Sequence, residues 1–537
     1  MTQPHDYQQN YLDAIAKGWA DGFRRQLIDL PTGGGKTNVA AWEIAKALKR
    51  FERCLFLADQ SDLVFQPAKR IEDLLGVKCD IEKAEFRAND ADVVCASVQT
   101  LMRSARLESW PQDAFDLIIA DEADKSISPS WKKVLNHFDG KAKVLGQTAT
   151  PKRTDKKNLG IYYDNLIALE SLQSLILKGF LSPIKILMLP IKIELPDVKG
   201  DYSDEEADEI ITPHLKSIAE AIKEHAYFRK TLVFLPLIKT AKLMDEICKS
   251  IGLSSEYIYG DDPERADKMR RYERDEISVM SNAMVLTRGV DMPNVDCIIF
   301  ARVTKSDTLV KQAGGRGTRV MYAPGVDIRD QASRIAHIAS GPKPDCLFLD
   351  FLYQMGKRLK CRPAHLIAQT DDEADAITKV MEDASAALPS DVIAQLDLVQ
   401  VMADVSSQRE MSLRAKLEAN KNKQAKVISA EEFAMKYNSL ETAEFEPTMA
   451  WERKDLTPNM VKNLEKAGID SATVRGFEHG TRLLNLYWKN KKLKLASHGQ
   501  RATMKRMGFP NWEHATEAEA KQFFSSLNKR KEQPEMI

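Results

Sequence analysis

The sequence predicts an α/β fold: two parallel-sheet domains in tandem, followed by a mostly helical C-terminal region. Two parts of the chain alternate short apolar runs with amphipathic stretches of helix length. Strands that alternate with helices form mostly parallel sheets covered on both faces. After residue 351 the apolar runs fade. A chain of 537 residues is also too long for one hydrophobic core, so we expect about two to four domains.

The first α/β domain is expected over residues 1–195. Its strands are predicted at five short apolar runs, 26–30, 54–58, 93–96, 117–120 and 143–146. The run at 117–120 has no polar residue, which is typical of a parallel strand buried on both faces. Leu195 and Pro196 then open a segment rich in carboxylates. We predict an acidic linker over 196–214.

The second α/β domain is expected over residues 215–355. Its strands are predicted at 231–235, 256–259, 279–281, 296–301 and 346–350. We expect a helical region over 356–450 and a small helical domain over 451–537. The last domain has a weak two-fold repeat at a spacing of 40 residues, in which Thr457, Leu464 and Gly468 recur as Ser497, Met504 and Gly508. Thr or Ser fits a helix N-cap and Gly a C-cap, so each copy predicts a short capped helix.

Composition argues against a membrane-spanning protein and against a disulfide-stabilised one. Apolar residues make up 43% of the chain, and no segment approaches the roughly 20 apolar residues of a membrane helix. Seven cysteines are scattered without a C-x-x-C pair, so we expect no disulfide framework, no zinc module and a reducing cytoplasm. The first residues are neither basic nor apolar, so we expect no export signal. A net charge of zero leaves nucleic-acid binding open, because phosphate contacts are local.

A glycine-rich segment between the first predicted strand and a helix is a candidate phosphate cradle. Glycines let backbone N–H groups converge on phosphate oxygens, and a helix N-terminus favours anions. Lys36 would reach the β- and γ-phosphates of a nucleoside triphosphate, and Thr37 would bind Mg²⁺. The segment departs from the general pattern, which has glycine where this chain has Leu30. The alternative is a glycine-rich turn without a ligand.

Two adjacent carboxylates follow the fully apolar strand. Asp121 would hold Mg²⁺ through water, and Glu122 would polarise the attacking water. A triphosphate site needs such carboxylates as well as the cradle, and the two motifs come in the expected order. The alternative is an acidic strand end at the surface.

Two arginines three residues apart, Arg316 and Arg319, stand in a glycine-rich segment of the second domain. On a helix they would project in the same direction. Arginines from a second domain stabilise charge on a transferring phosphoryl group. The alternative is a solvated basic face, although glycine is unfavourable inside a helix. Thr148 and Thr150 flank an alanine at another strand end, where a threonine-capped turn is the simpler interpretation on local grounds.

Taken together, the motifs resemble those of the superfamily 2 helicases and translocases over roughly residues 5–351. Nine motifs occur in family order, at 7–8, 31–37, 57–64, 96–100, 121–124, 148–150, 231–234, 289–293 and 312–319. The resemblance implies two RecA-like domains, with ATP and Mg²⁺ in the cleft between them. It also implies a nucleic-acid strand across both domains.

The resemblance assigns roles residue by residue. Gln8 would contact adenine, and Gly289 and Asp291 would lie near the ribose. The phosphates and the metal would be held by Thr32, Gly33, Gly34, Gly35, Lys36, Thr37 and Asp121. Gln312, Arg316 and Arg319 would face the γ-phosphate, with Arg319 as the arginine finger. Thr148 and Thr150 would couple the ATP state to the strand, whose backbone Ser97, Gln99 and Thr100 would touch.

The residues 121–124 spell DEAD, yet the sixth motif begins Lys311-Gln312 where DEAD-box RNA helicases have His-Arg. Segments 150–153, 260–265 and 344–351 resemble the RadD, XPB and type I restriction-motor group, which acts on DNA. The resemblance stops at the motor, because RadD-like proteins carry a zinc module that this chain lacks.

We therefore predict an ATP-dependent DNA helicase or translocase that binds single-stranded, forked or duplex DNA. The alternatives are a duplex translocase that does not separate strands, an RNA helicase, and a non-enzymatic scaffold. We expect it in the cytoplasm of a bacterium or a phage-infected host, with protein partners from replication, repair or a phage.

A basic stretch near the C-terminus is a second candidate contact with nucleic acid. Lysines 489, 491, 492 and 494 would grip phosphates, and the adjacent Tyr487 and Trp488 would stack a base. The alternative is a helix whose aromatic residues pack inward and whose lysines are merely solvated.

Overall fold

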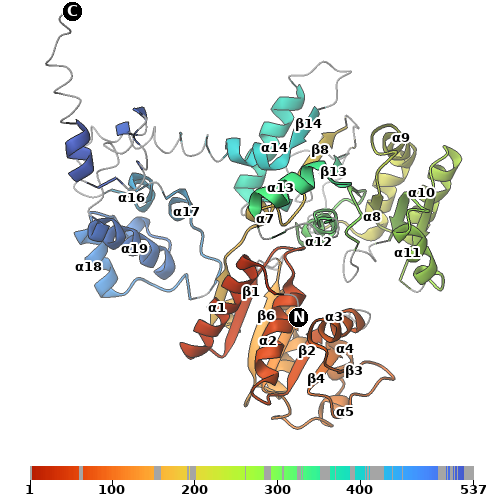
Figure 1. The fold of residues 1–537 in the computed structure, drawn as a ribbon, viewed down its shortest axis with the longest axis horizontal. Coiled ribbons are helices and arrows are strands. Elements are labelled where there is room, and N and C mark those ends of the chain that lie inside the picture. The colour runs from red at the N-terminus through yellow and green to blue at the C-terminus, as the bar shows by residue number, and fades with distance from the viewer. Residues whose placement is uncertain are drawn as a thin grey trace, which may run out of the picture. The chain divides into compact units, whose positions relative to one another are not determined.

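The computed structural model contains two compact units, residues 1–405 and 406–537. The described residues are 3–59, 64–149, 159–189, 193, 201–260, 262–283, 292–304, 307–322, 328, 330–350, 363–368, 371–386, 394–405, 407, 411, 428–437, 439–449, 451–493, 503, 504, 506, 507, 509, 512, 515, 516 and 518–524. The first unit holds two sheets and their helices (Figure 1).

The first sheet has seven parallel strands in the order β3-β4-β2-β5-β6-β1-β7. The strands are β1 (Arg25–Asp29), β2 (Cys54–Ala58), β3 (Cys79–Glu82), β4 (Val93–Ser97), β5 (Leu117–Asp121), β6 (Lys143–Thr148) and β7 (Asn165–Ala168). The five predicted strands are confirmed. Sequence reasoning missed β3 and β7, the two edge strands. Each has only four residues, and a polar residue interrupts or begins its apolar run.

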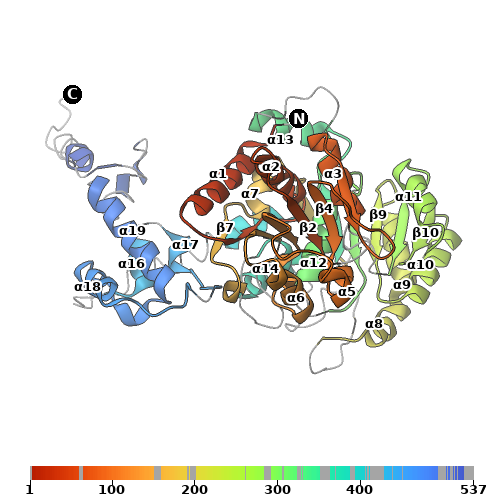
Figure 2. The ribbon, with the colours of Figure 1, turned by 90° about the horizontal axis from the view of Figure 1, so that it is seen from below.

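Helices cover both faces of this sheet. They are α1 (Asp6–Ala20), α2 (Lys36–Leu48), α3 (Phe65–Leu75), α4 (Val98–Leu101), α5 (Ser104–Leu107) and α6 (Pro129–His137). Helices α1, α2 and α3 lie on one face, and α5 and α6 on the other (Figure 2). Strands β2 and β4 are buried at every position, as a strand between two helical layers must be.

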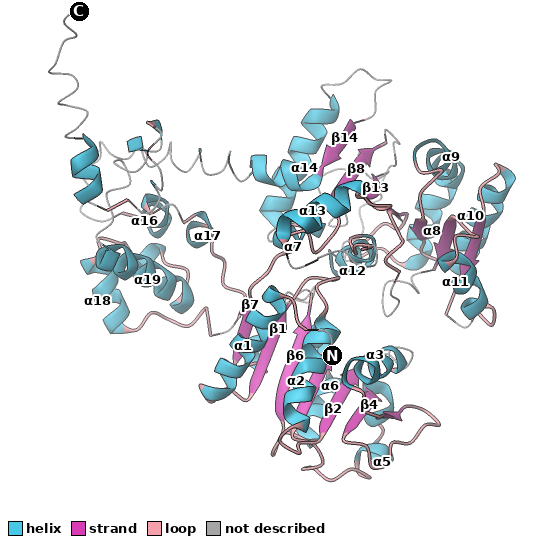
Figure 3. Cartoon of the chain, in the orientation of Figure 1, coloured by secondary structure: helices cyan, strands magenta, loops and turns pink. Residues whose placement is uncertain are grey.

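The second sheet has the order β10-β11-β9-β12-β13-β8-β14. Its strands are β8 (Ile184–Met188), β9 (Thr231–Phe234), β10 (Ser255–Ile258), β11 (Val279–Asn282), β12 (Cys297–Phe300), β13 (Cys346–Asp350) and β14 (Ala394–Asp397). All pairs are parallel except β14 with β8. Two mostly parallel sheets in tandem confirm the predicted class of two RecA-like domains, and the five strands predicted for this sheet are present (Figure 3).

Helices also separate most of the strands of the second sheet along the chain. They are α7 (Leu172–Leu177), α8 (Asp204–Ile211), α9 (Leu215–His225), α10 (Ile238–Ser250), α11 (Arg265–Glu273), α12 (Asp307–Gly317), α13 (Gln331–Ser340) and α14 (Asp371–Ala386). Of these, α7 precedes β8 and is tied to α13, because Arg334 donates to the carbonyl of Lys178 at 2.9 Å.

Three elements differ from the predicted boundaries. Strand β8 joins the second sheet although it lies before residue 195, because it pairs in parallel with β13. Helix α8 lies inside the predicted linker, where Ser203 caps it and Glu206 completes a capping box. Strand β14 lies in the region predicted as helical, and it extends the sheet beyond β8. Strands β8 and β14 belong to the second sheet because they pair with strands that are distant in the sequence. The local sequence pattern does not reveal this pairing.

The second unit is helical where it is described. It contains α16 (Ala430–Lys436), α17 (Leu440–Ala443), α18 (Pro458–Lys466) and α19 (Phe477–Leu493), which share a core that includes Phe433, Leu464 and Leu483. In the first copy of the repeat Thr457 caps α18, and Gly468 has the left-handed φ of 77°. Ser497 and Gly508 of the second copy lie outside the described residues. Among the described helices, none is long and apolar enough to cross a membrane.

Candidate nucleotide site

The predicted phosphate cradle is the turn between β1 and α2. Gly33 and Gly35 have φ values of 87° and 80°, in the left-handed region that favours glycine. Gly35 is the N-cap of α2, and Lys36 is the first residue of the helix. The Lys36 ammonium donates to the carbonyl of Leu30 at 3.3 Å. The turn therefore presents a helix N-terminus and a lysine at one point, which suits an anion.

Leu30 explains how the chain departs from the general glycine pattern. Its side chain is fully buried. A Cβ on Gly34 would lie 2.8 Å from a methyl carbon of Leu30 and 3.0 Å from the carbonyl oxygen of Pro31. Leu30 thus fills the space beneath the loop, and glycine is needed at position 34 because nothing larger fits above it.

Helix α1 supports the loop from behind. The hydroxyl of Tyr7 donates to the carbonyl of Gly34 at 2.9 Å, and the amide of Gln8 donates to the same oxygen at 3.2 Å. The other end of the Gln8 amide accepts from the backbone N–H of His5 at 3.0 Å. In this arrangement Gln8 stabilises the loop; its adenine contact remains a prediction.

Asp121 and Glu122 lie where β5 ends, next to the phosphate loop. The side chain of Gln147 on β6 donates to the Asp121 carboxylate at 2.9 Å. Burial and, to a smaller extent, the charge of Glu122 together raise the pKa of Asp121 to about 6, whereas Lys36 opposes the shift. Glu122 has a left-handed φ of 51°, which is uncommon for a residue with a side chain and typical of constrained functional sites.

Asp121 and Thr37 offer the kind of oxygen ligands that Mg²⁺ prefers. The ionised form of Asp121 is disfavoured by burial and by Glu122, and a divalent cation beside these carboxylates would favour it instead. The two residues therefore fit the metal that the sequence implies. A metal held there would neutralise charge on triphosphate oxygens.

The cradle opens into a cavity of about 440 Å³ that both sheets line, within the range of small-molecule sites. The first sheet contributes Thr32, Gly33, Gly35, Lys36, Thr37, Asn38, Gln66, Arg70 and Glu122. The second sheet and the segment before it contribute Phe180, Leu181, Pro293, Arg316, Arg319, Val320 and Tyr322. The structure thus brings the two arginines to the same space as the lysine and the glutamate.

Arg316 is not part of a solvated basic face, because it is 6% exposed. It lies near the C-terminal end of α12, with Arg319 just beyond the helix. Burial lowers the pKa of each guanidinium to about 10, and for Arg316 the charge of Glu122 opposes the shift. Both groups therefore stay protonated at neutral pH, in a setting where solvent screens them little.

Glycines allow α12 to touch the phosphate loop. A Cβ on Gly315 would lie 2.3 Å from the Cβ of Thr32, and a Cβ on Gly33 would lie 2.8 Å from Leu181. Leu181 and Arg319 form an antiparallel bridge, and Ser182 donates its N–H to the carbonyl of Thr318 at 2.7 Å. Glycine at 315 is thus explained by close packing and not by backbone conformation.

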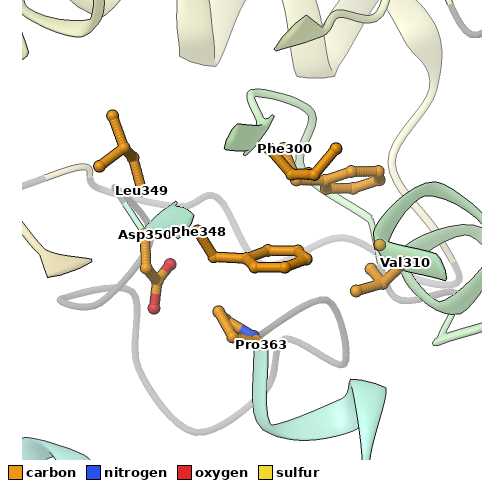
Figure 4. Close-up of a pocket in the computed structure, with 8 residues that line it drawn as sticks. Phe300, Val310, Phe348, Leu349, Asp350 and Pro363 are labelled. Carbon is orange, nitrogen blue, oxygen red and sulfur yellow. The ribbon is translucent and has the colours of Figure 1, made fainter. Parts of the chain in front are cut away.

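A second cavity, of about 20 Å³, lies beneath α12 inside the second sheet's domain (Figure 4). Phe300, Val310, Phe348, Asp350 and Pro363 are among its lining residues. Its volume is near that of one water molecule, so it is too small for a nucleotide. This space is a packing feature between β12, β13 and the helix that carries Arg316.

Two of the three residues predicted to touch the nucleic-acid strand have buried side chains. Ser97 and Thr100 are buried, and the Ser97 hydroxyl caps α4 by accepting from the N–H of Thr100 at 3.2 Å. The Thr100 hydroxyl accepts from the N–H of Ala84 at 3.1 Å. Gln99, between them, is exposed. As placed here, only Gln99 of the three presents its side chain to solvent.

Thr148 is fully buried at the end of β6, and its carbonyl accepts from the N–H of Leu30 at 3.0 Å. It therefore connects β6 to the start of the phosphate loop. Thr150, Gly289 and Asp291 lie outside the described residues, as does the side chain of Gln312.

The basic tail is partly described. Lys489 is exposed on α19, Trp488 is 49% exposed, and Tyr487 packs against the core of the second unit. The inward alternative thus holds for Tyr487 and not for Trp488. The side chains of Lys491 and Lys492, and all of Lys494, lie outside the described residues.

Sequence reasoning missed several residues of the cavity wall, notably Phe180, Tyr322 and Arg70. Phe180 lies under the guanidinium of Arg334, which is 3.9 Å from its ring centre, and it also contacts the Tyr7 ring. The hydroxyl of Tyr322 donates to the carbonyl of Gly179 at 2.6 Å. These residues stand outside any short motif, and only the folded chain brings them together.

Comparison with known proteins gives the family. The model for the res subunit of type III restriction enzymes matches residues 1–153, and the model for the helicase conserved C-terminal domain matches 213–321. The "Putative ATP-dependent helicase IRC3" of Saccharomyces cerevisiae is 31% identical over 343 residues, which cover 59% of this chain and 50% of that protein. The type I restriction enzyme EcoAI endonuclease subunit of Escherichia coli is 26% identical, over 59% and 44% of the two chains.

The chain belongs to the superfamily 2 helicases and translocases. Its matches include the res subunit of type III restriction enzymes and subunits of type I restriction enzymes. The predicted family is thereby confirmed. This superfamily 2 chain spans about half the length of the curated relatives it matches. Among solved structures, a fragment titled "putative HsdR subunit of a type I restriction enzyme" from Vibrio vulnificus has 23% identity and a TM-score of 0.49, over 68% of this chain and 67% of that one.

Proposed function

We propose that this chain is an ATP-dependent DNA helicase or translocase that couples Mg²⁺–ATP hydrolysis to movement on DNA. The observation that carries the proposal is the shared cavity: Lys36 and Glu122 from one sheet face Arg316 and Arg319 from the other. A site divided between two domains is complete only when the domains are together. Hydrolysis can therefore be linked to opening and closing.

The residues divide the work by their chemistry. Lys36 and the N–H groups of the loop would hold the phosphates, while Thr37 and Asp121 would hold the metal. Glu122 would accept a proton from the attacking water. Arg316 and Arg319 would stabilise charge on the transferred phosphoryl group, and we assign the finger to Arg319. Gln8, Asp291, Gly289 and Gln312 keep the adenine, ribose and γ-phosphate roles that the family resemblance gives them.

For the contact with nucleic acid, we propose that Gln99 touches the backbone and that Ser97 and Thr100 position the segment that carries Gln99. This revision rests on their burial and on the α4 cap. Thr148 and Thr150 would link the strand to the phosphate loop, as the contact from Thr148 to Leu30 suggests.

DNA is favoured over RNA by the relatives whose names state a DNA-directed activity. The EcoAI and EcoKI relatives are endonuclease subunits of type I restriction enzymes. An RNA helicase is the rival, because SrmB of Escherichia coli, named as an RNA helicase, matches at 20% identity. A translocase without strand separation is the other rival. We place the protein in the cytoplasm of a bacterial or phage-infected cell, with partners from replication, repair or a phage.

ATPase activity measured with single-stranded, forked and duplex DNA and with RNA tests the proposal. We expect DNA to stimulate turnover more than RNA, because cleft closure depends on both ligands. Equal or greater stimulation by RNA would favour the RNA rival. Strand displacement on forked DNA then separates a helicase from a translocase, and wild-type turnover no higher than that of Glu122→Gln would support a scaffold.

A further inference from the structure

Two half-exposed phenylalanines stand together at the carboxyl edge of the first sheet, outside every motif described above. Phe65 begins α3, after β2, and Phe86 follows β3. Their rings meet edge to face with centres 5.4 Å apart. They are 41% and 44% exposed, so each leaves part of its apolar surface in water. Exposed apolar side chains that contact each other form a candidate surface for another molecule.

The turn that carries Phe86 is held in place by its neighbours. Lys83 and Phe86 exchange backbone hydrogen bonds of 3.2 and 2.7 Å across the turn. Arg106 on α5 donates to the carbonyls of Phe86 and Ala84. Thr100 on α4 accepts from the Ala84 N–H at 3.1 Å. The phenylalanine pair, which we call the aromatic platform, is therefore a fixed surface, and binding to it costs little ordering of the turn.

Cations outnumber carboxylates among the exposed charges around the platform, although Glu85 is exposed in the same turn as Phe86. The ammonium of Lys83 lies 4.8 Å from the centre of the Phe65 ring. Arg87, Arg103 and Lys133 are exposed on neighbouring segments of the same edge. Two carboxylates of this edge are engaged by cations, Glu82 with Arg106 and Asp59 with Lys125. Exposed aromatic rings among cations suit a ligand that has flat bases and phosphates.

The platform is also continuous with the proposed strand contact. Thr100, which holds the turn of Phe86, is next to Gln99. Helix α3 carries Phe65 at its start, and its Gln66 and Arg70 line the nucleotide cavity. One short helix therefore connects the platform to the cavity.

We propose that Phe65 and Phe86 stack bases of a single nucleic-acid strand, with Lys83 and Arg87 against its phosphates. This inference rests on the proposed function and adds a base-stacking site to it. A single strand fits better than a duplex, because bases inside a duplex are not available to an aromatic face. DNA and RNA share this chemistry, so the test includes both.

The test compares wild type with Phe65→Ala/Phe86→Ala by fluorescence anisotropy on a 20-nucleotide oligo(dT), an oligo(U) and an abasic oligomer with the same phosphate charge. Stacking on aromatic residues is worth about 1–3 kcal/mol per base, so we expect about tenfold or greater loss of affinity on the oligomers with bases. We expect no difference on the abasic oligomer. Phe86→Trp, which keeps an aromatic face, should bind oligo(dT) like wild type.

Phe228→Ala is the matched control, because Phe228 is 97% exposed on the second sheet's domain, away from this edge. It should bind like wild type. Equal affinity of wild type and the double variant for oligo(dT) and oligo(U) would overturn the proposed base stacking. The two phenylalanines would then be assigned to a contact with a protein partner. An equal loss on the abasic oligomer would also overturn it. A wild type that binds no nucleic acid would instead overturn the proposed function.

Discussion

Arg316 at the end of α12 and Glu122 at the end of β5 face one cavity from two different sheets, and the charge of Glu122 favours the protonated form of the Arg316 guanidinium. More than 190 residues of sequence separate them. Because a carboxylate and an arginine from different domains face the same cavity, the site depends on how the two sheets approach each other.

Arg319→Ala should lower turnover by about a thousandfold while ATP still binds. The guanidinium would act on charge that develops in the transition state, so its loss affects kcat far more than affinity. Steady-state ATPase and nucleotide binding by fluorescence would measure the two effects. Arg319→Lys should recover only part of the rate, because lysine lacks the planar fork. Normal turnover of Arg319→Ala would refute the assignment of the finger.

Lys36→Ala should remove ATP binding and leave the fold intact. Its ammonium lies at the helix N-terminus that faces the cavity, and its hydrogen bond to Leu30 is partly exposed and replaceable by water. Isothermal titration with ATP and far-UV circular dichroism would measure binding and fold. Lys49→Ala, at the other end of α2, is the control and should bind ATP normally. Retained affinity in Lys36→Ala would mean that the cradle is only a turn.

Asp121→Asn should stabilise the nucleotide-free, metal-free protein at neutral pH. The folded-state pKa of about 6 is above the ordinary value of 3.8, so between these two pH values the folded chain holds a proton that the unfolded chain releases. The stability tied to this proton is present below about pH 4 and is lost as pH rises through about 6. Asparagine removes that loss, by about 1–3 kcal/mol above pH 6.

Thermal unfolding midpoints of the two proteins, measured in EDTA from pH 4 to 8, would test this. The gain should be several degrees at pH 7.5 and should vanish near pH 4. Asp113→Asn, at an exposed position, should show no gain at either pH. A gain for Asp121→Asn that does not change with pH would contradict the electrostatic cause.

Gly315→Ala should lower ATP turnover by tenfold or more without unfolding either sheet. A Cβ there would lie 2.3 Å from the Cβ of Thr32, so α12 and the phosphate loop could not approach as closely. A displacement of an ångström is enough to cost about a hundredfold in rate. Gly140→Ala is the control, since a Cβ at Gly140 meets nothing within 4 Å. Wild-type kinetics in Gly315→Ala would show that close approach is not needed.

Neutralising the tail lysines 489, 491, 492 and 494 with glutamine should flatten the salt dependence of DNA affinity. Each phosphate contact that is lost removes about 0.7–0.9 from the slope of log K against log salt. Affinity for DNA measured at salt concentrations from about 50 to 200 mM would give the slope. Lys462→Gln/Lys466→Gln on α18 is the control. An unchanged slope would assign the stretch to a solvated helix.

The sequence by itself determined the fold class, the phosphate loop and the order of the motifs. These are local properties. An apolar run such as 117–120 predicts a buried strand, and the glycines before Lys36 predict a turn into a helix, without knowledge of any distant residue. Ten predicted strands are present for this reason.

Only the tertiary structure decided how distant parts meet. It placed β8 and β14 in the second sheet through pairing. It showed that Ser97 caps a helix by accepting from the N–H of Thr100, and it put Phe180 and Tyr322 on the wall of the cavity. Strand pairing, burial and contacts between domains join residues that are far apart in the chain, so no local pattern contains them. Whether two arginines face a phosphate site or water depends on such contacts.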